Sequence, residues 1–297
     1  MHAKRIITIL VILIVLISAI TTLTGILSEA GPGRFEYESI RGKTVIICGE
    51  GIYKHMSADV AVQGIAQDYV TLFIGIPLLL ISLWGYRKNN NRSRFLLAGT
   101  LSYFFVTYLF YTAMGMYNYL FLAYVVLMGV SFFALFNVLN SFQLNDVPEL
   151  FREKTPSKFV GGFLIVNSVA IALLWLSVVV PPLLDSSIYP DALQHYTTLI
   201  VQGFDLGLLL PIAFVTGILL IKKRPLGYLI GTTYVIFLSI LMLSLTAKLI
   251  SMASVGVEVL PAVFIIPTFC IISISCSILM LNKIKKKIRK SINKLQT

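Results

Sequence analysis

Long apolar runs alternate with short polar segments along the whole chain. A helix needs about 20 mostly apolar residues to cross the hydrocarbon core of a bilayer. Eight runs reach that length, so the pattern predicts eight membrane-spanning helices. Their expected bounds are 6–28, 66–86, 95–114, 118–140, 159–181, 198–221, 225–249 and 259–281. Little chain remains outside them, so the predicted fold is an all-α, polytopic membrane helix bundle forming one transmembrane domain over 1–297.

The first apolar run has two interpretations. Lys4 and Arg5 precede it, as basic residues precede the core of a signal peptide. The run is longer than a typical signal core, and Glu29 occupies the centre of the best cleavage-like site. We therefore expect an uncleaved first span, whereas cleavage would leave seven spans.

The charge distribution predicts the orientation of the bundle. Charged residues make up 12% of the chain, and a soluble domain carries about 25%. The net charge of +11 could indicate nucleic-acid binding, but 19 of the 24 Lys and Arg residues fall on one side of the predicted bundle. An excess of Lys and Arg marks cytoplasmic segments. We therefore expect a prokaryotic inner-membrane protein with both termini in the cytoplasm, and no nucleic-acid partner.

The polar connections carry further predictions. Residues 44–48 are rich in β-branched side chains and predict a strand or an extended cover. Residues 57–67 predict a helix start, capped by Ser57, that runs into the second span. The short turn at Tyr117 and Asn118 predicts a tight hairpin of the third and fourth spans. The tail, 283–297, has helical spacing of apolar positions and seven basic residues. It predicts a basic amphipathic helix against anionic lipid headgroups, or a simple topology anchor.

An internal similarity suggests two parallel four-helix halves, 1–145 and 156–282. Val-Gln-Gly precedes both Asp68 and Asp205, and a proline and a basic cluster follow each. The aspartate-to-proline separation is nine residues in the first half and six in the second. If the duplication is real, the two aspartates are equivalent.

Four charged residues in or beside apolar segments are the main functional candidates, because charge inside a membrane is costly and usually functional. They are Asp68, Asp205, Lys248 and Glu258, all mapped to the outer half of the bundle. Polar neighbours at the same level are Gln67, Gln202, Tyr108, Tyr111 and Asn118. We expect an outward-facing polar pocket for a cation, a proton or a small polar molecule.

Structural explanations compete with that pocket. Asp205 and Lys248 could form an ion pair that only fixes helix packing. Asp68 could cap a helix start in the headgroup region, and Glu258 could lie there too. Asp205 is the deepest of the four, and Gly203-x-x-x-Gly207 predicts that its helix face is buried in protein.

No other chemistry is indicated. The chain lacks GxSxG, HExxH and Walker motifs, and its three histidines fall at an end or in loops. Three cysteines show no metal spacing. We predict no catalytic residue, metal or cofactor. The leading prediction is binding or translocation of a small polar solute or ion. A non-catalytic subunit or sensor is the first alternative, and an enzyme for a lipid-linked substrate at the outer leaflet is the second.

Some strings resemble a group of bacterial and archaeal multi-pass membrane proteins. They are Gln67-Asp68-Tyr69-Val70-Thr71-Leu72 running to Pro77-Leu78-Leu79, the segment 117–124, and Asp205-Leu206-Gly207 running to Pro211. The resemblance covers about Gly49 to Leu245. It implies a recurring architecture of about eight spans and brings no activity, substrate or cofactor with it.

Overall fold

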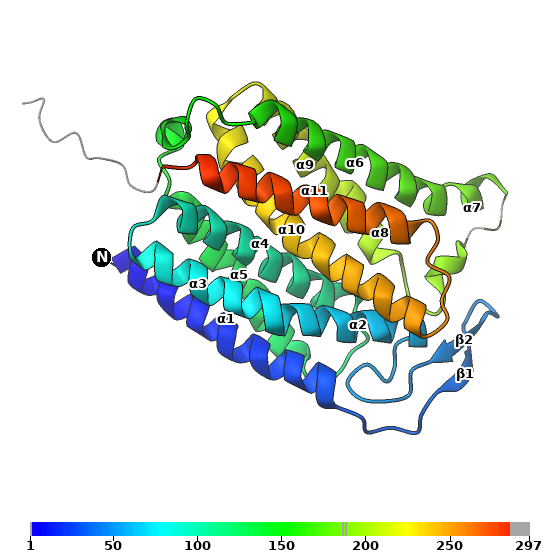
Figure 1. Ribbon diagram of the computed structural model, residues 1–297. Coiled ribbons are helices and arrows are strands. Elements are labelled where there is room, and N and C mark those ends of the chain that lie inside the picture. The colour runs from blue at the N-terminus through cyan, green and yellow to red at the C-terminus, as the bar shows by residue number, and fades with distance from the viewer. Residues whose placement is uncertain (1, 186, 188, 286–297) are drawn as a thin grey trace, which may run out of the picture.

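The computed structural model describes residues 2–185, 187 and 189–285, and eight helices in these residues have the length and composition of membrane spans (Figure 1). The spans cover 4–27, 58–87, 91–114, 121–140, 157–179, 200–221, 225–254 and 262–283. The predicted all-α polytopic bundle is confirmed. The largest difference in bounds is the second span, which begins eight residues earlier than expected.

The elements follow the chain in two sets. In the first half they are α1 (His2–Leu27), β1 (Phe35–Glu38), β2 (Thr44–Ile47), α2 (Ala58–Val70), η1 (Thr71–Gly75), α3 (Ile76–Arg87), α4 (Asn91–Met114) and α5 (Phe121–Asn140). The connection is η2 (Leu144–Leu150). In the second half they are α6 (Ser157–Val179), α7 (Pro181–Leu184), η3 (Asp191–Leu193), α8 (Ile200–Phe204), η4 (Asp205–Leu209), α9 (Leu210–Ile221), α10 (Pro225–Ser254) and α11 (Ala262–Lys283).

Local sequence marks the helix ends at the connections. Asn90 precedes α4, and its side chain accepts a hydrogen bond from the Arg92 amide, which satisfies one free N–H of the first turn. Pro225 opens α10, a position where the missing N–H costs nothing. A six-residue connection separates α4 from α5, and these two helices pack closely, as the predicted hairpin requires.

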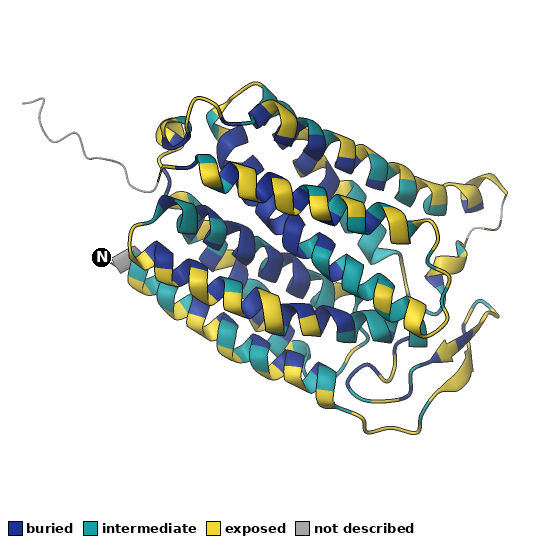
Figure 2. Ribbon diagram, viewed as in Figure 1, coloured by how far each residue is buried: buried dark blue, intermediate teal, exposed yellow. Residues whose placement is uncertain are grey.

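The most deeply buried residues lie along α4 and α10, which cross at the centre of the bundle (Figure 2). Gly99 allows the close crossing, because a Cβ atom there would lie 2.4 Å from Cγ2 of Ile236. Tyr103 and Phe104 of α4 are fully buried. The centre of the fold is therefore a closely packed pair of helices, one from each half.

The helix contacts of one half have counterparts in the other. In the first half α4 packs against α3 and α5; in the second, α10 packs against α9 and α11. Across the centre, α2 contacts α10, while α8 contacts α4. This exchange is the pattern expected of two related halves, although the duplication itself stays a prediction.

Two π-helical segments, η1 and η4, interrupt the second and sixth spans, and each is followed by a helix with proline at its second position. Proline lacks the amide that would bond the carbonyl four residues earlier. Aligning the halves on these segments pairs Asp205 with Thr71, and Asp68 with Gln202. In this alignment the two aspartates are not at equivalent positions, because their separations from the following prolines differ by three residues.

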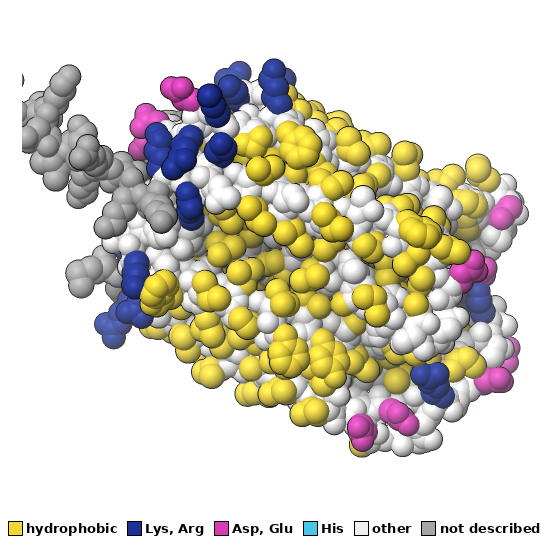
Figure 3. All heavy atoms as spheres, in the orientation of Figure 1, with side chains coloured by type: hydrophobic (Ala, Val, Ile, Leu, Met, Phe, Trp, Pro, Cys, Tyr) yellow, Lys and Arg dark blue, Asp and Glu magenta, His cyan; other side chains and the backbone are white. Residues whose placement is uncertain are grey.

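Lys and Arg side chains gather at the end of the bundle that holds the N-terminus (Figure 3). We call this the basic end, and the opposite end, with β1 and β2, the loop end. The strands pair antiparallel, Phe35 with Ile47, which confirms the predicted strand. The predicted tail helix covers 283–297, and residues 286–297 lie outside the described residues. Ile284, near its start, is extended and forms an antiparallel bridge with Phe151.

Candidate functional site

Asp68 lies inside the bundle with its carboxylate fully enclosed. The residue is 3% exposed. The Tyr53 hydroxyl donates to Oδ2 at 2.5 Å, and the Tyr111 hydroxyl donates to Oδ1 at 3.0 Å. Helix α2 begins at Ala58, so Asp68 lies about 15 Å along the helix. The alternative that Asp68 caps a helix start is therefore wrong. The helix begins directly after Ser57, the residue that was expected to cap it.

Tyr53, which the sequence did not single out, comes from the loop between β2 and α2. Burial raises the pKa of the Tyr53 phenol well above its ordinary value, and the negative charge of Asp68 raises it further, so the hydroxyl remains a donor. Two glycines make room for the pair. A Cβ atom at Gly25 of α1 would lie 1.8 Å from Oδ2 of Asp68, and one at Gly64 would lie 2.9 Å from the Tyr53 ring.

A chain of hydrogen bonds leads from α2 to the centre of the bundle. Gln67 Nε2 donates to the Tyr103 hydroxyl at 2.7 Å, and the Thr71 hydroxyl is 2.8 Å from the same oxygen. The Tyr103 hydroxyl also lies 3.2 Å from Ser244 Oγ of α10. Gln67 is therefore buried beside Asp68, as expected, whereas Tyr103, Thr71 and Ser244 emerge only from the packing of the three helices.

The remaining first-half candidates differ in their contacts. Tyr111 donates to a carboxylate, as the sequence suggested. Tyr108 does not: its hydroxyl lies 3.3 Å from Thr21 Oγ1, and its ring stacks on Tyr124 with centroids 6.2 Å apart. Asn118 accepts a hydrogen bond from the Leu120 amide at 2.9 Å, which shapes the turn before α5. Its role in the described residues is therefore local.

Asp205 forms a second, more open centre. The Trp175 indole of α6 donates to Oδ2 of Asp205 at 2.7 Å, and Asp205 is half-buried. Gln202 lies one turn earlier on α8 and is also half-buried. Gly203 and Gly207 are exposed, and a Cβ atom at either would meet nothing within 4 Å. The prediction that these glycines pack against another helix is wrong, because they face away from the bundle.

Lys248 lies on α10 between the two centres. Ser244 and Ser251 lie on the same face of α10. Ser244 Oγ lies near the Tyr103 hydroxyl, and the Ser251 hydroxyl donates to the Val62 carbonyl at 3.2 Å. Lys248 lies within electrostatic range of both Asp68 and Asp205. Among the described residues, however, the one ion pair within 4.0 Å is Lys43 with Asp191. The alternative of a direct Asp205–Lys248 pair is therefore wrong.

Glu258 does not belong to either centre. It is exposed in the connection between α10 and α11, and the last span begins only at Ala262. Pro261 and Gly256 bracket that connection, and they place the glutamate outside the apolar helix. Glu258 therefore lies before the last span, as the expected bounds 259–281 already placed it, and it does not join the polar pocket to which it was assigned as a candidate.

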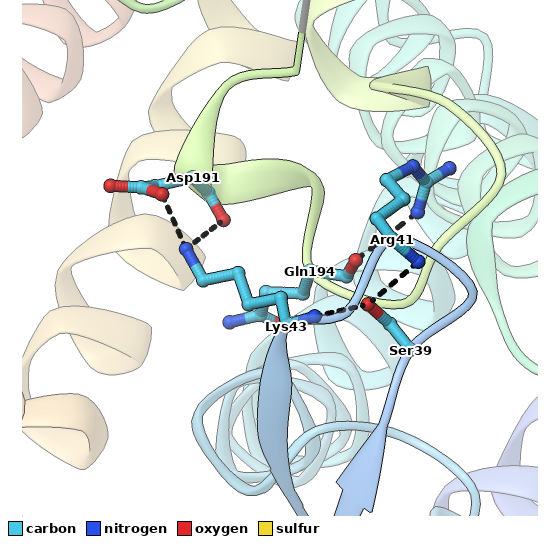
Figure 4. A network of polar contacts seen from close by, with 5 residues as sticks. All are labelled: Ser39, Arg41, Lys43, Asp191 and Gln194. Carbon is cyan, nitrogen blue, oxygen red and sulfur yellow. Dashed lines mark hydrogen bonds and ion pairs between the residues drawn. The ribbon is translucent and has the colours of Figure 1, made fainter. Parts of the chain in front are cut away.

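Two loops interlock over the loop end, and we call residues 34–57 and 189–199 together the loop-end cap. The Arg41 guanidinium donates to the carbonyls of Gln194 at 3.2 Å and Tyr196 at 2.9 Å. Lys43 pairs with Asp191 at 2.5 Å, and Ser39 Oγ accepts from the backbone amides of Arg41 and Lys43 (Figure 4).

The cap is also fastened to the start of α2. The Tyr196 hydroxyl lies 3.2 Å from both the amide and Oγ of Ser57, and Gln194 donates to Asp59 at 3.0 Å. Burial raises the pKa of the Tyr196 phenol. Above Asp68, the first loop places Tyr53 on the carboxylate, and the second loop holds the first loop. The outward-facing pocket stays a prediction, since neither described pocket is lined by Asp68.

Comparisons with known protein families, curated proteins and solved structures gave no match. The geometry alone thus supports a functional interpretation. It brings Asp68, Gln67 and Tyr111 into one buried cluster and sets Asp205 and Gln202 in a second centre. Lys248 lies between the two.

Proposed function

We propose that this integral membrane protein binds a proton or a small cation at Asp68 and uses it to translocate a small polar solute. The observation that supports this proposal is the enclosure of Asp68. Both carboxylate oxygens accept hydrogen bonds from tyrosines, and no described Lys or Arg lies within ion-pair distance of them.

The energetic argument concerns the charge of Asp68. A buried carboxylate without a paired cation costs several kcal/mol, and hydrogen bonds offset only part of that cost. A bound proton neutralises the group, and a bound alkali cation compensates it. Ionisable residues inside membrane helices commonly serve as proton or ion sites for this reason.

The hydrogen-bonded chain supports a path for that cation. Gln67, Thr71, Tyr103 and Ser244 connect the neighbourhood of Asp68 with α10 at the bundle centre. Lys248 follows Ser244 by one turn on α10 and acts electrostatically on Asp205. In this proposal Lys248 carries the electrostatic coupling between the two centres, since each carboxylate stabilises its ammonium group.

The loop-end cap supports a closed state in the proposed cycle. Access to Asp68 from the loop end requires Tyr53 to leave the carboxylate. The two loops are joined through Arg41 and Lys43. Movement of the first loop therefore either breaks these contacts or moves the second loop with it. Opening therefore exchanges a small set of polar contacts for hydration, which suits a gate that closes reversibly.

Reconstituted vesicles test the cation step directly. The purified protein is placed in vesicles containing a pH-sensitive dye, and a potassium diffusion potential drives proton entry; a parallel experiment follows radioactive sodium. We expect flux above that of empty vesicles. Asp68→Asn removes the binding carboxylate and should abolish the flux, and Asp205→Asn should reduce it at least tenfold.

Asp185→Asn is the matched control, since Asp185 is an exposed carboxylate at the loop end whose hydrogen bond to Ser187 lowers its pKa. This variant should keep the full flux. Proton and sodium fluxes that do not change in either Asp68→Asn or Asp205→Asn would overturn the proposal. If, in addition, neither pH nor sodium changes the stability of any variant, the subunit or sensor alternative would be favoured.

A further inference from the structure

A cavity with both polar and apolar lining and an apolar groove adjoin at the loop end of α1. The cavity has a volume of about 270 Å³. It is bounded by the end of α1, the loop that carries Tyr53 and the turn between α4 and α5. A shallow groove on α1 begins at Ser28, which also lines the cavity, and continues along Thr24, Leu27 and Leu23. The two features therefore adjoin at Ser28, and the groove continues from there along α1.

The cavity has the chemistry of a site for an anionic group. Lys54 and His55 line it from the loop, and Asn118 lines it from the turn. Tyr117 and Tyr119, which are 78% and 74% exposed, also line it. Glu29 and Glu50 are neighbours in sequence but do not line the cavity. The fixed charge of the described lining is therefore the Lys54 ammonium.

The groove has the chemistry of a site for a hydrocarbon chain. Leu23 and Leu27 are 43% and 70% exposed on the outer face of α1. The Thr24 hydroxyl already donates to the Ile20 carbonyl at 2.8 Å, so it presents its methyl group rather than a free donor. From Ser28 to Leu23 the groove extends about 7 Å along the helix axis.

We propose that this surface binds a lipid with an anionic headgroup from the leaflet at the loop end. The headgroup phosphate contacts Lys54 within the cavity, and an acyl chain lies along Leu27 and Leu23. Tyrosines concentrate at the depth of lipid headgroups, which fits Tyr117 and Tyr119 at the rim. Charge complementarity selects an anionic headgroup over a zwitterionic one.

The bound lipid would touch the segment that holds Tyr53 against Asp68. Ile52 and Lys54 flank Tyr53 and both line the cavity. The Ile52 amide donates to Ser28 Oγ at 2.8 Å, which ties this segment to α1. Lipid occupancy therefore stabilises the segment in the position that it has here. This inference does not depend on the proposed translocation.

Lipid titration of the detergent-solubilised, full-length protein tests the site. The probes are short-chain phosphatidylglycerol, phosphatidylcholine with the same chains, and inorganic phosphate, with binding followed by native mass spectrometry and by thermal unfolding. We expect phosphatidylglycerol to bind most tightly. Lys54→Gln should weaken the binding of phosphatidylglycerol about fivefold, because one lysine near an anionic lipid surface contributes roughly this much to the affinity.

Two further variants separate the possible outcomes. Leu27→Gln should weaken the binding of phosphatidylglycerol without changing the binding of inorganic phosphate. Arg34→Gln removes the same charge from an exposed loop-end position outside the cavity and should change nothing. Three results would overturn the inference. Phosphatidylcholine or inorganic phosphate could bind as tightly as phosphatidylglycerol, or Lys54→Gln could bind phosphatidylglycerol as tightly as Arg34→Gln does.

Discussion

The Tyr53 hydroxyl donates a hydrogen bond to Asp68 Oδ2 across the boundary between the loop-end cap and the membrane helices. The donor belongs to a loop and the acceptor to the middle of a span. Any displacement of that loop changes the environment of the buried carboxylate. The Tyr53 loop and the proposed binding group are therefore one structural unit, and variants at this contact should affect both.

Tyr53→Phe should lower the stability of the protein by about 1–3 kcal/mol, because a buried acceptor loses its donor while the ring stays in place. Thermal or denaturant unfolding in detergent measures the change. Tyr117→Phe is the control, since Tyr117 is exposed. Equal stability of the two variants would show that the Tyr53 hydroxyl contributes nothing.

Gly25→Ala should displace the Asp68 carboxylate, because the new Cβ atom would overlap Oδ2. We expect a loss of stability larger than the roughly 1 kcal/mol that alanine ordinarily adds to a helix. Gly129→Ala on α5 is the matched control, since a Cβ atom there meets nothing within 4 Å. Unfolding midpoints of the two variants should move in opposite directions; a shared stabilisation contradicts the close packing of α1 on Asp68.

The spans and the α4–α5 hairpin could be predicted from the sequence because long apolar runs and short turns report directly on membrane crossing. The helix start after Ser57 could be predicted too, although Ser57 makes no side-chain capping hydrogen bond. Only the hydropathy-based bound of the second span, residue 66, came too late. The first ten residues of α2 include Asp59, Gln63 and Gln67, which a hydropathy pattern assigns to a loop. Each side chain finds a partner in the folded protein: Asp59 accepts from Gln194 of the cap, Gln63 donates to the Asp59 carbonyl, and Gln67 donates to Tyr103 of α4.

The unusual position of Asp68 was predictable from the sequence, but its contacts were not. A carboxylate in an apolar run identified Asp68 as unusual. Its main contacts, Tyr53 and Gly25, are 15 and 43 residues away in the sequence, and no local spacing links them. The glycine pair beside Asp205 was misleading, because a small-residue spacing indicates a possible helix contact without specifying which face the bundle uses.

Trp175 should report on Asp205 through its fluorescence. The chain has two tryptophans, so Trp84→Phe leaves Trp175 as the single reporter. In that background Asp205→Asn replaces a charge-assisted hydrogen bond with a weaker neutral one and should shift the emission maximum. Asp185→Asn, at an exposed position, should leave it unchanged. An Asp205→Asn spectrum identical to that of the parent contradicts the indole–carboxylate bond.

The orientation can be read by cysteine labelling. Cys48 lies at the loop end, while Cys270 and Cys276 are buried in α11. If the basic end faces the cytoplasm, a membrane-impermeant maleimide should label Cys48 in intact cells. In a Cys48→Ser background, Lys88→Cys should react only after permeabilisation and Arg34→Cys should react without it. The reverse pattern overturns the expected orientation.

The alignment of the two π-helical segments has a consequence for direction. Each half has two corresponding polar positions one helical turn apart, at residues 68 and 71 and at residues 202 and 205. The acid occupies the first position in one half and the second position in the other. In the proposed translocation, the solute or ion would therefore meet unlike environments in the two halves, so even a bundle of similar halves would have a built-in polarity.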